Sequence, residues 1–255
     1  MEPKIIFEDE DILVLDKPAG MIVNRSDTTR DEVTLQDWVE KYLKIPRPKP
    51  QTAPLSEVSY AEQSKLDFVN RSGIVHRLDK ETSGIILVAK NSATFTNLQA
   101  QFRERKVQKN YLALSHGEIS PKEGEVNVSV GRLPWNRKRF GVLSGGRESV
   151  TEYKVLEVKH MSFGKDNESL SLVELYPKSG RTHQIRVHLQ YIKHPIFADP
   201  LYAGRKTSKR DRKILPRIFL HASRISFFHP KTNQLLTFEA QIPQELTSFL
   251  ATLNS

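Results

Sequence analysis

The sequence predicts an α+β protein built on a mixed, largely antiparallel β-sheet with flanking helices. Two observations carry this prediction. Most of the segments with strand character follow one another through short turns, which favours antiparallel neighbours over the long crossovers of a doubly wound sheet. The chain also has 255 residues, of which 38% are hydrophobic, so it can bury a sizeable core.

The N-terminal part is predicted to hold a pair of strands, a helix and a loop. The apolar segments at 5–7 and 12–17 flank an acidic turn, as in a hairpin. Thr34 is a typical N-cap for a helix whose apolar face extends to Leu43. The segment at 45–55 contains four prolines, which exclude regular structure and predict a surface loop or hinge.

Further along the chain, apolar runs predict strands and helical spacing of apolar residues predicts helices. The run IILVAK is continuously apolar, which is typical of a buried strand, and the last two strands are predicted to form a hairpin. The predicted strands lie at 85–90, 109–119, 152–161, 170–177, 224–230 and 235–243. The predicted helices lie at 92–107, at 183–192 and in a short C-terminal stretch from Pro243.

Composition excludes several kinds of protein. No apolar stretch approaches the ~20 residues that a membrane span needs, and the N-terminal sequence MEPKIIFEDED is too acidic for a signal peptide. We therefore expect a cytoplasmic protein with no membrane partner. The chain has no cysteine, which excludes disulfides, thiolate nucleophiles and cysteine-ligated zinc.

The basic residues are concentrated in two runs. The formal net charge is +9, which indicates a polyanionic partner but also suits a merely basic protein. Five cations and no acid lie in 132–147, and seven cations and one acid lie in 202–217. Either run alone is as well explained by a solvated loop. Together, with Trp135 and Phe140 in the first run, they favour two loops that contact the phosphates of a nucleic acid, and the predicted substrate-binding residues there are Arg137, Lys138 and Arg139.

A second candidate site begins in the stretch VHRLDKETSGIILVAK at 75–90, where His76, Arg77 and Asp79 precede the buried strand. Asp79 could simply cap a turn and pair with Arg77. Another stretch, KSGRTHQIRVHL at 178–189, favours a functional interpretation, because it carries two further arginines around a helix start. An arginine about 4 Å from a carboxylate contributes roughly 4 kcal/mol of attraction at an effective dielectric constant of about 20, before desolvation. Such an arginine would keep Asp79 ionised.

The 178–189 stretch supplies the remaining candidates. Gly180 is predicted to allow a tight turn, and Arg181 and Arg186 flank the helix start. A metal site built on His183, His188 and His194 is disfavoured, because spacings of five and six residues do not place them on one face of a helix.

The motifs resemble those of the RluA-type pseudouridine synthases, which isomerise uridines in ribosomal or transfer RNA. HRLDKETSG at 76–84 is similar to the family signature, and further blocks follow the family's order. These blocks are KPAGMIV at 17–23, KNYLA at 109–113, GRTHQIRVHL at 180–189, HPIFADPLYAG at 194–204 and LHASRISFFHP at 220–230. The resemblance implies a sheet in two lobes around a central catalytic cleft. It also implies a single catalytic domain over 1–255 with no separate S4-type RNA-binding domain, since the KPAG motif begins at residue 17.

The resemblance also implies roles for individual residues. Asp79 matches the catalytic aspartate, Tyr111 the ring that packs on the flipped uracil, and Arg186 the partner of the aspartate. Arg77 matches the side chain that enters the RNA where the base has left. Substrate contacts are further expected from His76, Arg181 and Ile185. A carboxylate can supply the transient nucleophile that the isomerisation needs, so no metal or other cofactor is expected.

Two alternatives to an active synthase stay open at this point. A catalytically silent RNA-binding protein could keep the fold, although the intact motif around Asp79 argues against it. A glycosidase would be expected to carry paired carboxylates, and the motifs offer only one. For the substrate we expect ribosomal large-subunit RNA rather than tRNA, and for the protein a monomer.

Overall fold

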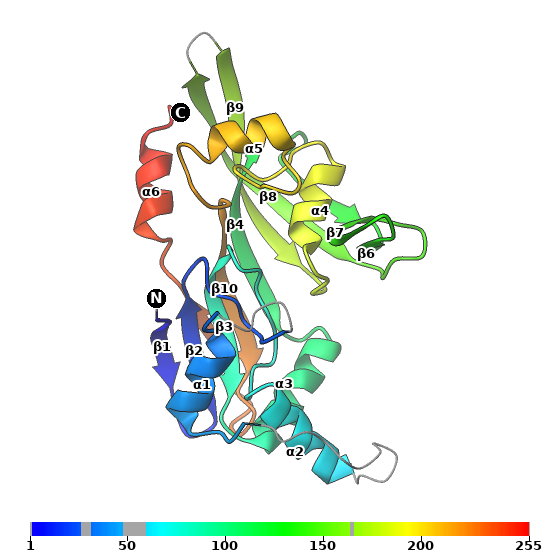
Figure 1. Ribbon diagram of the computed structural model, residues 1–255, viewed down its shortest axis with the longest axis vertical. Helices are drawn as coiled ribbons and strands as arrows, with labels where there is room; N and C mark the ends of the chain where they lie inside the picture. The colour runs from blue at the N-terminus through cyan, green and yellow to red at the C-terminus, as the bar shows by residue number, and fades with distance from the viewer. Residues whose placement is uncertain (1, 27–31, 48–59, 164–165, 255) are drawn as a thin grey trace. The chain divides into compact units, whose positions relative to one another are not determined.

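The computed structural model describes residues 2–26, 32–47, 60–163 and 166–254. The chain divides into two compact units (Figure 1). Unit 1 comprises Met1–Val107 and Ile225–Ala240, and unit 2 comprises Gln108–Arg224 and Gln241–Ser255. None of the helices in the described part of the chain has the length and apolar composition of a membrane-spanning segment.

Unit 1 contains a sheet with the strand order β1-β2-β3-β10, and β11 pairs with β10. The strands are β1 (Lys4–Glu8), β2 (Ile12–Lys17), β3 (Ser83–Ala89), β10 (Leu220–Phe228) and β11 (Leu235–Glu239). Strand β3 pairs antiparallel with β2 from Ala89 opposite Ile12 to Gly84 opposite Lys17, and every one of its residues is buried. This burial explains why the sequence of β3 is apolar without alternation.

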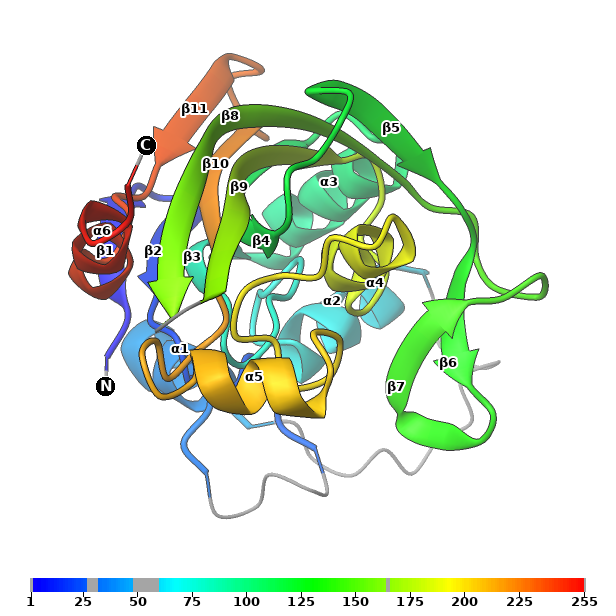
Figure 2. The same ribbon diagram turned by 90° about the horizontal axis from the view of Figure 1, so that it is seen from above.

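Three helices accompany this sheet. They are α1 (Leu35–Leu43), α2 (Tyr60–Asn70) and α3 (Ser92–Arg103), of which α2 and α3 lie side by side (Figures 1 and 2). Helix α1 begins with a capping box, in which Thr34 and Asp37 each accept a hydrogen bond from the other's backbone N–H. Phe95 and Leu98 of α3 pack against apolar side chains of the sheet to form the core of unit 1.

Unit 2 contains a sheet with the strand order β10-β4-β9-β8-β5, so β10 takes part in the sheets of both units. Its own strands are β4 (Gln108–His116), β5 (Glu123–Asn127), β8 (Val150–Phe163) and β9 (Asp166–Pro177), and the pairs β4–β9, β8–β9 and β5–β8 are antiparallel. Strands β6 (Val130–Leu133) and β7 (Asn136–Val142) form a hairpin outside this sheet (Figure 2). The helices are α4 (Gln184–Tyr191), α5 (Arg205–Asp211) and α6 (Gln244–Ala251).

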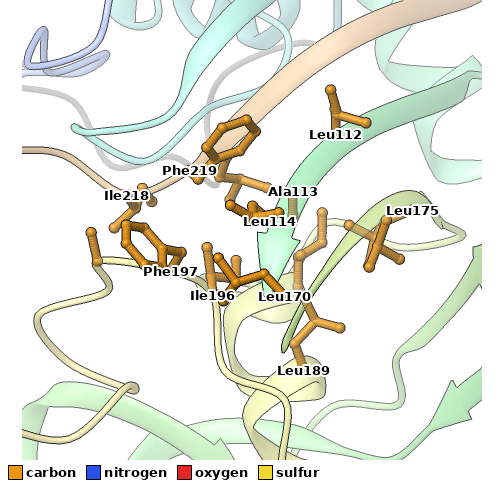
Figure 3. Close-up of a cluster of buried hydrophobic side chains, with 14 of the residues drawn as sticks. Leu112, Ala113, Leu114, Leu170, Leu175, Leu189, Ile196, Phe197, Ile218 and Phe219 are labelled. Carbon is orange, nitrogen blue, oxygen red and sulfur yellow. The ribbon is translucent and has the colours of Figure 1, made fainter. Parts of the chain in front are cut away.

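The core of unit 2 joins strand, helix and loop residues. Figure 3 shows Leu112 and Leu114 of β4 beside Leu170 and Leu175 of β9, with Leu189 of α4 below them. Loop side chains complete the cluster, among them Ile196, Phe197, Ile218 and Phe219. This core fixes α4, which carries Ile185 and Arg186, two of the candidate residues of unit 2.

The expected α+β architecture with a largely antiparallel sheet is confirmed, as are most of the predicted elements. The confirmed elements are β1, β2, β3, β4, β8, β9, α1, α3, α4, α6 and the β10–β11 hairpin. Helix α2, strand β5 and the β6–β7 hairpin were not predicted. Most of the proline-rich segment lies outside the described residues.

The prediction that both basic runs are loops is wrong. Arg137, Lys138 and Arg139 lie on strand β7, and residues 205–211 form helix α5. The periodicity of apolar residues does not predict either element, because both consist largely of charged and polar residues and neither has a continuous apolar face.

Candidate active site

Asp79 lies at the first position of a β-turn that leads into β3. Thr82 N donates a hydrogen bond to Asp79 O at 3.1 Å, which closes the turn. Leu78 is buried, Arg77 is exposed and Asp79 is half-buried. The buried leucine anchors the loop in unit 1 between the two charged residues.

A buried lysine fixes the backbone next to Asp79. Lys17 is completely buried, and its Nζ donates to Pro18 O at 2.9 Å, Met21 O at 2.9 Å and Lys80 O at 3.2 Å. Gly20, whose φ of 87° few other residues adopt readily, donates its N–H to the same Lys80 O at 2.8 Å. The KPAG turn therefore holds the residue that follows Asp79. The KPAG motif is visible in the sequence, but the role of Lys17 follows only from these contacts.

His76 is tied to β3 by its ring. Its Nε2 accepts a hydrogen bond from Leu87 N at 2.9 Å, and the ring lies 5.1 Å from that of Phe102. This contact gives His76 a role in holding the Asp79 loop, and its predicted contact with substrate stays a prediction.

In unit 2, Arg186 is held by a carboxylate that the sequence analysis did not single out. Arg186 lies on α4 and is buried, and it makes a bidentate ion pair with the fully buried Asp199, with Nε and Nη2 at 2.8 and 3.0 Å from the two carboxylate oxygens. Asp199 also accepts the backbone N–H groups of Leu201 and Tyr202 at 2.8 and 3.1 Å. The guanidinium plane is thus fixed within unit 2. Its predicted pairing with Asp79 stays a prediction.

The ring of Tyr202 joins Arg186 to the β6–β7 hairpin. The guanidinium carbons of Arg186 and Arg139 lie 5.1 and 5.3 Å from the centre of this ring. The Tyr202 hydroxyl accepts from Phe140 N at 3.1 Å, donates to Phe140 O at 3.2 Å and lies 2.9 Å from His183 Nδ1. Arg139 therefore packs on an aromatic ring, which corrects its placement in a solvated loop with Arg137 and Lys138.

The start of α4 is organised by Gln184. Its Oε1 accepts from Ser179 Oγ at 2.7 Å and from Arg181 N at 3.0 Å, and its Nε2 donates to Val150 O on β8 at 3.0 Å. Ile185, which follows it, is buried. The positive φ in this stretch belongs to His183, at 57°, and not to Gly180, so the backbone here does not use the left-handed conformation that glycine favours at residue 180.

Strand β4 carries Tyr111 and a lysine on one face. Tyr111 is half-buried and lies opposite Leu175 of β9. Lys109 precedes it by two residues, so both side chains project from the same side of the strand. Lys109 Nζ donates to Ser179 O at 3.1 Å, and burial lowers the pKa of this ammonium to about 8.

The two basic runs differ in how they are held. On β7, Arg137 and Lys138 are exposed, and Trp135 at the hairpin turn is 77% exposed. On α5, Arg205, Lys206 and Lys209 are also exposed. Both runs therefore present cations that are available to phosphates.

Helix α5 is attached to the sheet by a buried charge network. His116 at the end of β4 lies 2.6 Å from Glu168 and 3.0 Å from the fully buried Asp211, and Arg210 pairs with both carboxylates. Burial opposes a charged imidazole, but hydrogen bonds to Asp211 and Glu168 raise the pKa of His116 to about 9. The network is thus charged at neutral pH.

The three histidines of the disfavoured metal site have separate partners. His183 lies beside Tyr202, His188 Nε2 lies 3.0 Å from Ser149 Oγ, and His194 Nδ1 donates to His116 O at 2.8 Å. Within the described ranges, no group of three histidine, aspartate or glutamate side chains could hold a metal ion.

A comparison with known protein families shows to which family the chain belongs. The sequence model of the family described as RNA pseudouridylate synthase matches residues 11–191, which includes the Asp79 turn, β4 and α4. The chain belongs to this family. Its match extends over parts of both unit 1 and unit 2.

Curated relatives of the RNA pseudouridylate synthase family cover nearly all of the chain. The ribosomal large subunit pseudouridine synthase D of Neisseria meningitidis serogroup B is 35% identical over 98% of this chain and 60% of its own length. An uncharacterized RNA pseudouridine synthase of Bacillus subtilis is 34% identical over 99% of this chain and 73% of its own length. The chain thus spans about two thirds of the length of these relatives.

Solved structures of two human proteins are similar to this chain over nearly its whole length. Human RNA pseudouridylate synthase domain containing 1 is 25% identical and superposes with a TM-score of 0.72 over 99% of this chain and 88% of its own length. Human RNA pseudouridylate synthase domain containing 4 has a TM-score of 0.67 over 99% of this chain and 94% of its own length, and at 21% identity it supports the fold alone.

Proposed function

We propose that this member of the RNA pseudouridylate synthase family isomerises uridine to pseudouridine in RNA. The reaction breaks the bond between N1 of uracil and C1′ of the ribose and joins C5 to C1′. The hydrogen on C5 leaves to solvent, and N1 gains a proton. The observation that supports this proposal most strongly is Asp79, a half-buried carboxylate on a turn whose next residue is held by Lys17 and Gly20. A fixed carboxylate suits a nucleophile that must attack either the ribose or the base.

In this proposal Tyr111 packs on the extruded uracil and Arg186 supports the charge of Asp79. Arg77, which is exposed, occupies the place that the base leaves in the RNA. His76, Arg181 and Ile185 complete the substrate contacts, and Arg137 and Lys138 bind phosphates farther along the strand. No step of the reaction requires a metal or redox cofactor, and we propose that none is used.

A tritium-release assay tests the reaction. RNA labelled at uridine C5 should lose tritium when the protein is added, in the presence of a chelator and without nucleotide. Asp79→Asn should abolish release while the Kd for RNA changes little, because phosphate contacts supply most of the binding.

A matched control separates a specific effect from general damage. Asp67→Asn removes another half-buried carboxylate of unit 1, on α2, and should retain full activity. Normal turnover by Asp79→Asn would remove this residue from the mechanism. Free uracil as the only product would identify a glycosidase, and RNA binding without any release would identify a silent binding protein.

For the substrate we propose large-subunit ribosomal RNA, with tRNA as the second candidate. The support is the name of several relatives, ribosomal large subunit pseudouridine synthase D, at 34–35% identity. Labelled large-subunit RNA and bulk tRNA should be compared as substrates, and efficient turnover on tRNA alone would reverse this choice. We further propose that the protein acts as a monomer in the cytoplasm and that both units belong to one catalytic domain, which agrees with a family match that extends into each of them.

A further inference from the structure

Lys109 is an ammonium group whose charge has no counterion. Its Nζ makes one hydrogen bond, to Ser179 O at 3.1 Å, and among the residues that the structure describes no carboxylate pairs with it. An ammonium has three donors, so two of them have no protein partner among the residues that the structure describes. A desolvated cation without a partner is costly to keep, and its pKa of about 8 reflects that cost.

The segment beside Lys109 offers backbone and a second cation. A Cβ placed on Gly180 would meet only Lys109 Nζ, at 3.9 Å, so nothing else lies close to this backbone on that side. The next residue, Arg181, makes one guanidinium contact, from Nε to Glu148 O at 3.4 Å, and has no carboxylate partner in the described part of the chain. Two cations without counterions thus flank a glycine that leaves space for a ligand.

We propose that Lys109, together with Gly180 and Arg181, forms a binding site for one phosphodiester of the substrate RNA. The proposal rests on the proposed function. A phosphate supplies the negative charge that this site lacks, whereas a uracil carbonyl would satisfy a donor and leave the charge uncompensated. Gly180 lets the phosphate approach the backbone without meeting a side chain.

The position of the site gives it a specific use. Lys109 lies on the same face of β4 as Tyr111, and residues two apart on a strand are separated by about 6.6 Å. The two side chains therefore start from neighbouring points on one face, so Tyr111 and Lys109 can contact the base and a phosphate of one nucleotide or of adjacent nucleotides. Lys109 therefore binds a phosphate next to the uridine on which Tyr111 packs, and it acts as a positioning residue for the reaction.

Binding of a phosphate would raise the pKa of Lys109, so RNA affinity should depend on the protonation of this residue. With a pKa of about 8, about nine tenths of the amine is charged at pH 7 and about one tenth at pH 9. The Kd of the Asp79→Asn protein for a labelled transcript of large-subunit ribosomal RNA should therefore rise by up to about tenfold over this range, beyond any change seen with Lys109→Met. Asp79→Asn is used as the parent so that no turnover occurs.

Two variants make the test decisive. Lys109→Met should bind more weakly at pH 7, and the slope of log Kd against log salt concentration should fall by roughly 0.7 to 0.9, as expected for one lost phosphate contact. Lys109→Arg keeps a permanent charge, so it should retain most of the affinity and lose the pH dependence between 7 and 9. Lys122→Met, which removes an exposed lysine of unit 2, is the matched control and should leave both pH dependence and salt slope unchanged.

The outcomes separate this inference from the proposed function. Equal pH dependence and salt slope in the parent and Lys109→Met would overturn it, even when wild-type protein releases tritium normally. If Lys109→Met proves unfolded by circular dichroism, the comparison with Lys109→Arg decides, and an identical pH dependence in the two proteins overturns the inference. Absence of RNA binding by the parent itself would contradict the proposed function, and with it the phosphate site.

Discussion

Asp199 and Arg186 should behave as one unit in stability. Asp199→Asn keeps the size of the side chain but removes the charge that faces the guanidinium, and it places an amide group where two oxygens accept four hydrogen bonds. Asp199 is fully buried and Arg186 is nearly so, so the arginine would be left as an uncompensated charge. Breaking a buried pair in this way costs about 3–5 kcal/mol of unfolding free energy.

Thermal unfolding followed by circular dichroism measures this cost. At about 2–4 °C per kcal/mol for a chain of this size, the Tm should fall by about 6–20 °C. Tritium release should fall as well, because the orientation of Arg186 depends on this carboxylate. Glu123→Gln is the matched control, since it breaks an ion pair between Glu123 and Lys154 whose side chains are 66% and 53% exposed. That change should cost no more than about 1 kcal/mol.

A double-mutant cycle tests the cause. Arg186→Met alone leaves Asp199 as the unpaired buried charge, whereas the double variant leaves neither. The double variant should therefore be more stable than the sum of the single effects predicts, by about 1–3 kcal/mol. Additive losses, or an Asp199→Asn protein with an unchanged Tm, would show that the pair does not hold Arg186 in place.

Three further perturbations have expected outcomes. Lys17→Met should reduce tritium release more than RNA affinity, because the Asp79 turn loses its anchor; equal activity in Lys17→Met and wild type would refute this role. Folding raises the pKa of His116 from 6.5 to about 9, so the protonated imidazole stabilises the folded protein. This stabilisation is complete below about pH 6.5 and is lost as the pH rises through 9. The free energy of unfolding in urea should show this loss in wild type but not in His116→Gln. Tyr202→Phe should lower the free energy of unfolding by about 1–3 kcal/mol, since Phe140 loses a partner for both backbone groups, and an unchanged urea midpoint would show that these hydrogen bonds are replaced by water.

Much of the fold follows from local signals that the sequence contains. Strand β3 is a continuous apolar run, and its complete burial explains why no alternation is needed. Helix α1 begins at the cap that Thr34 predicts, and the capping box with Asp37 adds a second local signal. Helix α6 follows Pro243 as expected. In each case neighbouring residues alone determine the element.

The elements that were not predicted depend on distant residues. Helix α5 contains no apolar residue, and its place is set by the network of His116 and Glu168, which come from β4 and β9. The β6–β7 hairpin is attached through Tyr202, about 60 residues farther along the chain. Periodicity within a segment carries no information about such contacts.

The same distinction applies to the candidate site. Asp79, Tyr111 and Arg186 are found through motifs that a sequence displays directly. Asp199 and Lys17 also lie within quoted motifs, but their roles consist of contacts with residues 13 and 63 positions away. Only the folded structure shows which carboxylate pairs with Arg186 and which carbonyl accepts from Lys17.

The division of β10 between the two units has a consequence for synthesis on the ribosome. Unit 1 is completed by Ile225–Ala240, which follow the 117 residues from Gln108 to Arg224. At about 5–20 residues per second, roughly 6–23 s pass between the appearance of the first part of unit 1 and that of its last strands. During this interval β3, whose residues are all buried in the finished fold, lacks its neighbour β10. The part of its edge that does not pair with residues 73–75 is then open to other nascent chains. The N-terminal unit therefore cannot finish folding before most of the C-terminal unit has been made, and a fragment ending at Val107 should aggregate.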